Sequence, residues 1–385
     1  MAQTMTYDVV VVGAGPVGSA AACECAKQGL KTLCIEEHGT IGYPVQCAGL
    51  LSNAAFAECG VSERPVLNRV TGARILTGNG SDLLIDAKKT MACVVDRGAL
   101  DREMAENAAR EGAEYLLRTS VCGIQQNTLI TRGVERREPI AFKILIAADG
   151  PKGTIARLLG MERAQVYLAG IQADILHPCD PNLVEIHPDA SPGFFGWMIP
   201  TAPGRARVGL CARSDVPGLF DAFMSHYPSP CVHLVTGTLP LGVMPKTYGH
   251  RTLFVGDAAG FAKPTSGGGV YTGIRSARHA AAVALEACIR GRFDDSVLSG
   301  YEQRWQADFG RELTLGFGLF EMRQHMSGQD IDEMIQALSD PDIIRTIEEY
   351  GDMDRPSALV KKLLLTPGML RLLKPLVKTG LRAFL

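Results

Sequence analysis

A glycine-rich turn near the N-terminus is the first feature of the sequence that could do chemistry. In turns of this kind the first glycine allows a sharp bend and the second lets a pyrophosphate approach the backbone. The third lets a helix pack close to a strand, and the amides and dipole at the start of that helix attract phosphate groups. We therefore expect a dinucleotide phosphate site in the run Gly13-Ala-Gly-Pro-Val-Gly18, involving Gly13, Gly15, Pro16, Val17 and Gly18.

The segments around this turn have the order that a nucleotide-binding fold requires. Residues 7–35 read in turn as strand, helix and strand, and they end at two acids, Glu36 and Glu37. Glu36 lies 18 residues after Gly18, where an acid accepts hydrogen bonds from a ribose hydroxyl. An acid there, with no arginine nearby, indicates an unphosphorylated ribose and hence FAD or NAD. A glycine-rich turn in an unrelated α/β fold is the alternative.

Two later strands favour FAD. One ends in Asp149-Gly150 and the other in Gly256-Asp257. A carboxylate at the end of a parallel strand is well placed for a polyol, so we expect Asp257 to bind a ribityl chain. An NAD enzyme has no need of a second such element so far from the first.

A second glycine run follows Asp257. Gly267, Gly268 and Gly269 precede Val270, which begins a stretch with a helical pattern up to Ile289. Their backbone amides would face the pyrophosphate or the flavin N1–O2 edge, where negative charge develops on reduction.

These motifs together resemble those of the FAD-dependent oxidoreductases of the para-hydroxybenzoate hydroxylase fold group. The resemblance implies FAD as the cofactor. It implies that Arg97, in Val94-Val-Asp-Arg-Gly-Ala-Leu100, contacts the flavin; a surface ion pair with Asp101 is the alternative. Cys47, Ala48 and Val121 join the cofactor-binding residues through the same resemblance.

One branch of that group, the geranylgeranyl reductases, is more similar still. Gly42-Tyr-Pro-Val-Gln-Cys-Ala-Gly-Leu-Leu-Ser52 resembles their cysteine segment, and Pro192-Gly-Phe-Phe-Gly-Trp-Met-Ile-Pro200 resembles their Tyr-x-Trp-x-Phe-Pro motif. Phe195 replaces the tyrosine and Ile199 the phenylalanine, which removes a hydroxyl. The resemblance covers residues 5–290 and implies saturation of polyprenyl chains of membrane lipid precursors. The substrate-binding residues would be Phe194, Phe195, Trp197, Ile199 and Pro200. An apolar tunnel would be lined by Phe194, Phe195, Trp197, Met198 and Ile199; in the alternative interpretation these five are sheet core.

Reduction of an isolated alkene needs a proton or a shared positive charge as well as a hydride. Cys47 follows the acid-bearing strand and would serve as an acid or redox gate, and Trp197 would stabilise positive charge through its π face. A buried structural role is the alternative for Cys47.

The fold class that follows is α/β, with a Rossmann-like parallel sheet, an inserted antiparallel sheet and a helical C-terminal region. The inserted segments read as alternating strands without helical patterning. We expect the FAD-binding domain at 1–67, 93–164 and 246–292, the substrate sheet at 68–92 and 165–245, and the helical region at 293–385.

Composition limits the partners. A net charge of −2 gives no support for nucleic-acid binding, the 11 cysteines include no Cys-x-x-Cys pair, and no apolar run is long enough to span a membrane. We expect no metal and a cytoplasmic protein. No second dinucleotide motif is evident, so reduced nicotinamide, ferredoxin or deazaflavin would be an external electron donor.

The C-terminal tail is basic and leucine-rich. No acidic residue follows Asp354, and Pro367 and Pro375 divide the tail into short segments. Such a tail suits peripheral contact with the anionic inner face of a membrane; docking on its own protein is the alternative. For the whole chain, a flavin monooxygenase or halogenase and a non-catalytic electron carrier are the competing functions.

Overall fold

The valine run at the N-terminus forms the middle of a parallel sheet. In the computed structural model, which describes residues 5–134 and 139–363, β1 (Met5–Val12) pairs in parallel with β2 (Thr32–Ile35) and β11 (Ile140–Ala147). Its central valines are fully buried because elements cover both faces of the sheet. The order across the sheet is β17-β18-β11-β1-β2-β8. Its other strands are β8 (Glu114–Leu116), β9 (Thr119–Gln125), β10 (Thr128–Gly133), β17 (Tyr248–Gly249) and β18 (Thr252–Phe254).

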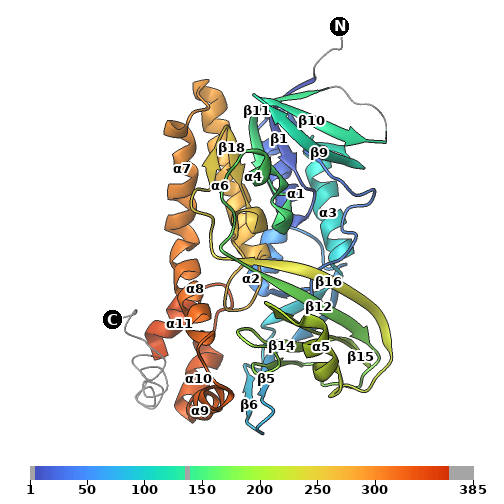
Figure 1. Ribbon diagram of the computed structural model, residues 1–385, viewed down its shortest axis with the longest axis vertical. Helices are drawn as coiled ribbons and strands as arrows, with labels where there is room; N and C mark the ends of the chain where they lie inside the picture. Colours follow the sequence, from blue (N-terminus) through green and yellow to red (C-terminus); the bar gives the residue numbers. More distant parts are fainter. Residues whose placement is uncertain (1–4, 135–138, 364–385) are drawn as a thin grey trace.

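Three helices pack side by side on this sheet (Figure 1). α1 (Pro16–Lys27) begins where the glycine-rich turn ends and lies between α3 (Arg97–Arg110) and α6 (Val270–Arg290). Short helices follow the strand ends: η1 (Gly150–Lys152) and α4 (Thr154–Leu158) after β11, and η2 (Gly256–Ala259) after β18. The Rossmann-like parallel sheet predicted from the sequence is confirmed.

A second sheet of seven strands has the order β16-β12-β15-β14-β13-β5-β6. Adjacent strands are antiparallel except β13 and β5, which run parallel because the chain leaves the sheet between them. The strands are β5 (Gly72–Leu76), β6 (Asp82–Asp86), β12 (Val166–Ile175), β13 (Leu183–His187), β14 (Gly196–Ala202), β15 (Arg205–Ala212) and β16 (Cys231–Leu241). Both predicted inserted segments contribute strands; their exact boundaries stay a prediction.

The expectation that these segments lack helices is wrong. α5 (Val216–Met224) lies between β15 and β16 and buries Phe220 and Phe223 against the sheet. Proline and glycine at its second and third positions obscure the helical pattern, although a proline is well tolerated in a first helical turn.

A small sheet of order β3-β7-β4 connects the two large ones. It consists of β3 (Leu50–Ser52), β4 (Val66–Val70) and β7 (Ala92–Val95), and α2 (Asn53–Cys59) follows β3 directly. β3 follows the loop that carries Cys47, and β7 leads into α3 with Arg97 at its first position. This sheet therefore fixes both residues relative to the parallel sheet.

The C-terminal region is helical as predicted up to residue 363. It forms a column beside α6 in Figure 1 and then turns toward the seven-stranded sheet. The tail beyond Leu363, with its proposed membrane-binding leucines and lysines, lies outside the described residues. The helices are α7 (Asp295–Trp305), the π-helix η3 (Gln306–Gly310), α8 (Arg311–Arg323), α9 (Gly328–Leu338), α10 (Pro341–Tyr350) and α11 (Pro356–Leu363).

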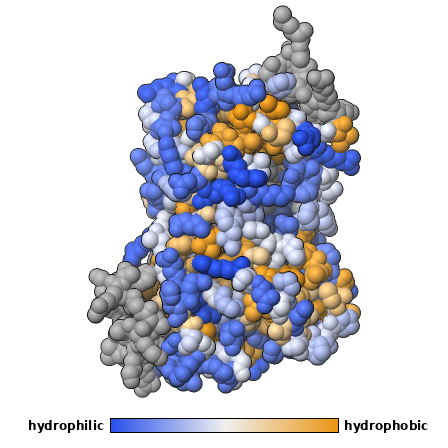
Figure 2. Space-filling view, viewed as in Figure 1, coloured by the Kyte–Doolittle hydropathy of each residue, from blue (hydrophilic) through white to orange (hydrophobic). Residues whose placement is uncertain are grey.

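The surface is mixed, and apolar side chains gather on the lower lobe in Figure 2, over the seven-stranded sheet. On the edge strand β16, Val232 is 61% exposed and Leu234 52% exposed. Within the two described ranges, no helix is both long and apolar enough to cross a membrane.

The glycine-rich turn generates a test of the packing. A Cβ at position 18 would lie 1.8 Å from the carbonyl oxygen of Gly13, whereas a Cβ at position 15 would meet nothing within 4 Å. We expect Gly18→Ala to lower the free energy of unfolding by about 3 kcal/mol or more because backbone must move. Gly15→Ala should cost about 1 kcal/mol or less. Urea denaturation of both variants is the measurement, and equal losses would contradict this packing.

Candidate functional site

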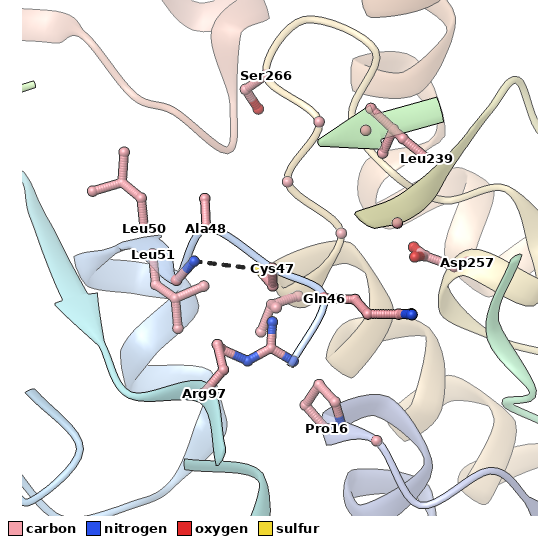
Figure 3. A pocket seen from close by; sticks show the side chains of 18 of the residues that line it. Pro16, Gln46, Cys47, Ala48, Leu50, Leu51, Arg97, Leu239, Asp257 and Ser266 are labelled. Carbon is pink, nitrogen blue, oxygen red and sulfur yellow. Dashed lines mark hydrogen bonds between the residues drawn. The ribbon is translucent and has the colours of Figure 1, made fainter. Parts of the chain in front are cut away.

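One cavity of about 510 Å³ lies where the two large sheets meet. Its wall comes from the start of α1, the loop before β3, the first residue of α3, strands β12, β14 and β16, and the loop before α6. Figure 3 shows these segments converging from widely separated parts of the sequence. Most of the predicted site residues line it: Gly15, Pro16, Val17, Gly18, Cys47, Ala48, Arg97, Gly150, Phe194, Phe195, Trp197, Ile199, Asp257, Gly267, Gly268, Gly269 and Val270.

The glycine-rich turn presents bare backbone to this cavity. Gly15 is the N-cap of α1 and provides no side-chain hydrogen bond to the first amides of the helix. Space for a phosphate exists there because nothing lies within 4 Å of where a Cβ would be. Gly13 stands behind the turn with φ of +100° and does not line the cavity. The turn thus offers amides and a helix dipole to an anion.

Glu36 lies behind the turn at the end of β2. Its Oε2 accepts a hydrogen bond from the amide of Ala14 at 2.8 Å, and its Oε1 contacts the amide of His38 at 2.9 Å and His38 Nδ1 at 2.6 Å. A carboxylate has about four acceptor positions, so Glu36 retains capacity for a ribose hydroxyl. Glu37 is not comparable, because it is more exposed and pairs with Lys152 at 2.6 Å.

Asp257 and Asp149 are the two strand-end carboxylates. Asp257 lies deep in the protein facing the cavity, and burial, partly offset by the positive charge of Arg97, raises its pKa to about 6. Asp149 lies just outside the cavity, and its Oδ2 accepts a hydrogen bond from the amide of Ile155 at 2.8 Å. Its Oδ1 is buried without a partner among the described residues, and burial raises its pKa too.

The second glycine run forms a tight loop before α6. The amide of Gly267 donates to the carbonyl of Lys263 at 2.8 Å, and the amide of Lys263 donates to the carbonyl of Gly268 at 3.1 Å. Gly269 caps α6 without a side-chain hydrogen bond, so this helix also presents its first amides to the cavity. A Cβ at Gly269 would lie only 2.6 Å from Asp257 Oδ1, which is why a side chain is excluded there.

Cys47 and Arg97 lie together on the opposite wall. The amide of Gly49 donates to Cys47 Sγ at 3.4 Å, and the guanidinium of Arg97 pairs with Asp101 at 3.1 Å. Figure 3 shows that guanidinium directed toward the loop that carries Cys47. The ion pair with Asp101 therefore exists, but it is buried in the cavity wall and not on the surface.

Aromatic side chains form the apolar part of the wall. The rings of Phe194 and Phe195 stack at 4.4 Å, Trp197 lies edge-on to Phe195, and Trp197 Nε1 donates to Gln172 Oε1 at 3.2 Å. Side chains alternate along β14, so Trp197 and Ile199 line the cavity while Met198 packs under α5. The expectation that Met198 lines the tunnel is wrong for this reason.

Four other predicted residues lie away from the cavity lining, namely Glu36, Glu37, Val121 and Pro200. Pro200 continues β14 and its carbonyl accepts from Asn68 Nδ2 at 3.0 Å, and Val121 is buried in β9. In the other direction, sequence reasoning missed Ser52, Lys263, Met353 and Asp354, which line the cavity. Two of them had a signal, since Ser52 ends the cysteine segment and Lys263 lies just before the second glycine run. Nothing in the sequence links Asp354 to a site that otherwise ends at Tyr271.

The cavity fits a flavin dinucleotide on the evidence of its own polar groups. Two helix starts without side-chain caps face it. Asp257 is a poorly solvated carboxylate that hydroxyl donors of a ligand could stabilise. Ser266 Oγ is buried without a hydrogen-bond partner among the described residues. Among those residues, no group of three or more His, Cys, Asp or Glu side chains could hold a metal ion.

Comparison with known proteins agrees with this geometry. Residues 6–213 match the FAD binding domain family. The chain is 30% identical to digeranylgeranylglycerophospholipid reductase 1 of Methanococcoides burtonii, over 87% of this chain and 88% of that protein. Digeranylgeranylglycerophospholipid reductase 2 of Methanothermobacter thermautotrophicus is 29% identical, over 91% and 98%. A crystal structure of a geranylgeranyl bacteriochlorophyll reductase-like protein from Thermoplasma acidophilum superposes with a TM-score of 0.87 at 25% identity, covering 97% of this chain and 100% of that one.

The chain is therefore an FAD-dependent oxidoreductase, and FAD is its cofactor. Within that class it belongs to the family of the digeranylgeranylglycerophospholipid reductases.

Asp257 generates a pH prediction for the FAD-free protein. Its pKa is about 6 in the folded protein against an ordinary 3.8, so between these values the folded state binds more protons than the unfolded state. The free energy of unfolding therefore falls as pH rises through this window, by at most about 3 kcal/mol. Asp257→Asn should lose this component and be the more stable protein at pH 7. Denaturant titrations at pH 4 and pH 7 measure it; parallel pH dependence in the two proteins would contradict it.

Proposed function

We propose that this protein saturates isolated C=C bonds in the geranylgeranyl chains of membrane lipid precursors. The observation that carries the proposal is a single cavity with two kinds of wall. One wall consists of bare backbone, helix starts and Asp257, and the other of Phe194, Phe195 and Trp197. The first suits a flavin dinucleotide and the second an apolar chain. The names of the relatives, which act on digeranylgeranylglycerophospholipids, support the same substrate class.

In this proposal the pyrophosphate of FAD lies on the amides of Gly15, Val17 and Gly18 at the start of α1, and Glu36 accepts from the adenosine ribose. Asp257 would accept hydrogen bonds from the ribityl hydroxyls. These bonds would stabilise the charged carboxylate and so offset the desolvation that raises its pKa. The amides of Gly268 and Gly269 would face the N1–O2 edge, because the amide of Gly267 already donates to the carbonyl of Lys263. When bound and reduced, FAD supplies a hydride.

Cys47 and Arg97 would supply the proton that the reaction needs. Addition of hydride to an isolated alkene leaves the second carbon in need of a proton. Cys47 is the thiol in the cavity toward whose loop the guanidinium of Arg97 is directed. We assign Cys47 as the proton donor to the alkene carbon, and Arg97 as the group that steadies the thiolate left behind. Trp197, fixed by Gln172 at 3.2 Å, presents its π face to the developing positive charge.

The proposal is tested by the product. The purified protein is reduced anaerobically and mixed with a geranylgeranyl ether lipid, and the lipid is analysed by mass spectrometry. We expect a gain of two hydrogens for each double bond reduced, independent of oxygen. An oxygen-containing product that forms only in air would contradict the proposal and indicate a monooxygenase.

Cys47→Ala tests the proton donor. We expect this variant to keep bound FAD and to lose alkene reduction by about 10²-fold or more, the usual size of acid catalysis. Cys211→Ala is the matched control, since Cys211 is a second thiol in the cavity wall but packs among apolar residues of β12 and α8. Undiminished turnover of Cys47→Ala, or equal losses in both variants, would rule out the assignment.

The external partners are also part of the proposal. Reduced nicotinamide, ferredoxin or deazaflavin would supply the electrons from outside, and we place the protein in the cytoplasm without a resident metal. Peripheral contact with the inner face of the membrane would involve the basic tail that follows Leu363.

Vesicle binding tests the membrane contact. Removal of residues 364–385 should weaken co-sedimentation with anionic vesicles about tenfold or more and leave binding to neutral vesicles little changed, since each basic residue near an anionic surface contributes about 1 kcal/mol. The exposed pair Val232 and Leu234 offers the control surface. If changing both to serine releases the vesicles and the deletion does not, the tail is not the contact.

A further inference from the structure

Lys263 and Asp354 form a buried ion pair in the cavity wall. Lys263 is 7% exposed and Asp354 2% exposed. The ammonium is bonded to Asp354 Oδ1 and donates to the carbonyl of Met353 at 2.8 Å, while Ser52 Oγ donates to Asp354 Oδ2. Moving an ammonium and a carboxylate out of water is costly, and an apolar pair of similar volume often stabilises a protein as well or better. Stability alone therefore does not explain why this ion pair is buried in the cavity wall.

The ammonium belongs to the second glycine loop. The backbone of Lys263 closes that loop through hydrogen bonds with Gly267 at 2.8 Å and Gly268 at 3.1 Å. The side chain then folds back over the loop, so that a Cβ at Gly268 would lie 3.6 Å from Nζ. The position of this charge relative to the loop amides is thus fixed by the backbone.

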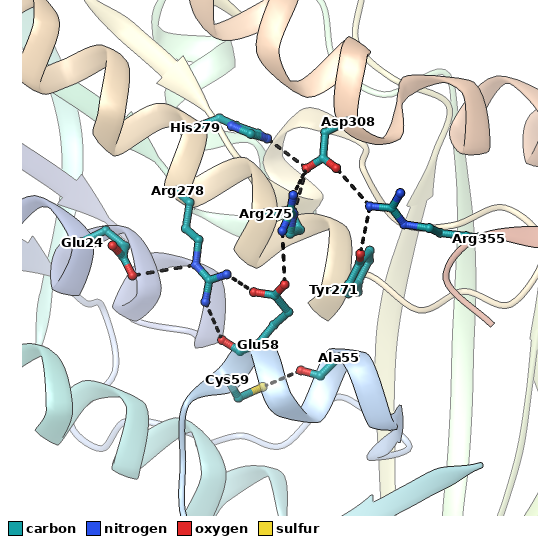
Figure 4. A network of polar contacts seen from close by, with 10 residues as sticks. All are labelled: Glu24, Ala55, Glu58, Cys59, Tyr271, Arg275, Arg278, His279, Asp308 and Arg355. Atoms are coloured by element: carbon teal, nitrogen blue, oxygen red, sulfur yellow. Dashed lines mark hydrogen bonds and ion pairs between the residues drawn. The ribbon is translucent and has the colours of Figure 1, made fainter. Parts of the chain in front are cut away.

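Asp354 comes from the opposite end of the chain. It lies between α10 and α11, and further contacts hold its segment in place: Arg355 donates to Asp308 Oδ1 at 3.2 Å and to the hydroxyl of Tyr271 at 3.4 Å. Asp308 also binds Arg275 and His279, so the segment is anchored to α6 through the polar network in Figure 4. The carboxylate is therefore held against Lys263 by more than their mutual attraction.

The other charged side chains of the cavity lie away from Lys263 or on the other side of the loop. Arg97 is paired with Asp101 at 3.1 Å on the far wall. Asp257 lies on the other side of the loop, 2.6 Å from where a Cβ of Gly269 would be. Lys263 is thus the cation next to the loop, and Asp354 is the anion that partly cancels it.

We propose that Lys263 raises the reduction potential of the bound FAD and that Asp354 limits the increase. This rests on the placement of the flavin N1–O2 edge at Gly268 and Gly269 proposed above. Reduction adds negative charge to that edge, so a nearby ammonium favours the reduced form and a nearby carboxylate opposes it. Asp354 acts as a positioning residue as well, because it and the Met353 carbonyl hold the ammonium over Gly268.

The test uses the opposite signs of the two charges. Lys263→Met and Asp354→Asn each break the same ion pair, so a structural role would move the flavin in the same direction in both. We expect the equilibrium constant for two-electron reduction to fall about tenfold in Lys263→Met and to rise about tenfold in Asp354→Asn. For a two-electron couple these changes correspond to about −30 and +30 mV in midpoint potential.

Potentials are measured on the FAD-bound variants at pH 7 by anaerobic equilibration with reference dyes. Ser52→Ala is the matched control, since it removes a hydrogen bond from Asp354 without changing charge, and its potential should stay at the wild-type value. Lys263→Arg should restore most of the lost potential. The affinity for sulfite, which adds to oxidised flavins and leaves negative charge on the N1–O2 edge, should move with the same signs, so the dissociation constant should rise in Lys263→Met and fall in Asp354→Asn.

Shifts of the same sign in Lys263→Met and Asp354→Asn, or no shift in either, would overturn the proposal. If Lys263→Met loses FAD, Asp354→Asn decides with Lys263→Arg as the charge-conserving control: a rise of about tenfold in Asp354→Asn beside a near wild-type value in Lys263→Arg supports the proposal, and no rise in Asp354→Asn overturns it. No lipid is present in these measurements. Opposite shifts in a protein that does not reduce alkenes would therefore contradict only the proposed function, and absent shifts in one that does would contradict only this inference.

Discussion

The close packing of α1 on α6 is the constraint on which the site depends. A Cβ at Gly273 would lie 2.4 Å from Val17, and one at Gly256 would lie 3.1 Å from it. These glycines let the first turns of both helices come together at the carboxyl end of the parallel sheet. Each helix starts without a side-chain cap, so their free amides face one cavity. The positive ends of two helix dipoles in one enclosed space create a site for an anionic dinucleotide.

The same constraint explains the unusual state of Asp257. It follows β18, in the turn that lets α6 approach α1, and its carboxylate faces the cavity without an ion-pair partner among the described residues. A carboxyl group in that position is costly unless hydroxyl donors reach it. The glycine turns, the helix starts and this carboxylate can therefore all bind the same dinucleotide. Trp197 of β14, with Phe194 and Phe195 just before the strand, then borders apolar space beside it for a second ligand.

Much of this site could be predicted from the sequence because its parts are local. The turn at Gly13–Gly18, the acid at Glu36 and the loop at Gly267–Gly269 each follow from spacing along a short segment, and the first turn and the loop line the cavity as expected. Strand alternation was harder to apply without the register, which is why Met198 was assigned to the wrong face. α5 was missed because its proline and glycine obscure a helix that tertiary packing stabilises.

The contribution of the C-terminal region could not be predicted in this way. Asp354 reaches the cavity only because α7 to α10 lead the chain back past α6, and no periodic pattern encodes where such a segment ends. Lys263 lies just before the second glycine run, but its ion pair could not be predicted without knowing where Asp354 lies.

A crystal structure of the FAD complex tests this arrangement most directly. We expect the pyrophosphate on the amides at the start of α1, the ribityl hydroxyls on Asp257 and the N1–O2 edge on the amides of Gly268 and Gly269. This arrangement is contradicted if the flavin lies with that edge turned away from the loop while Asp257 has no hydroxyl partner.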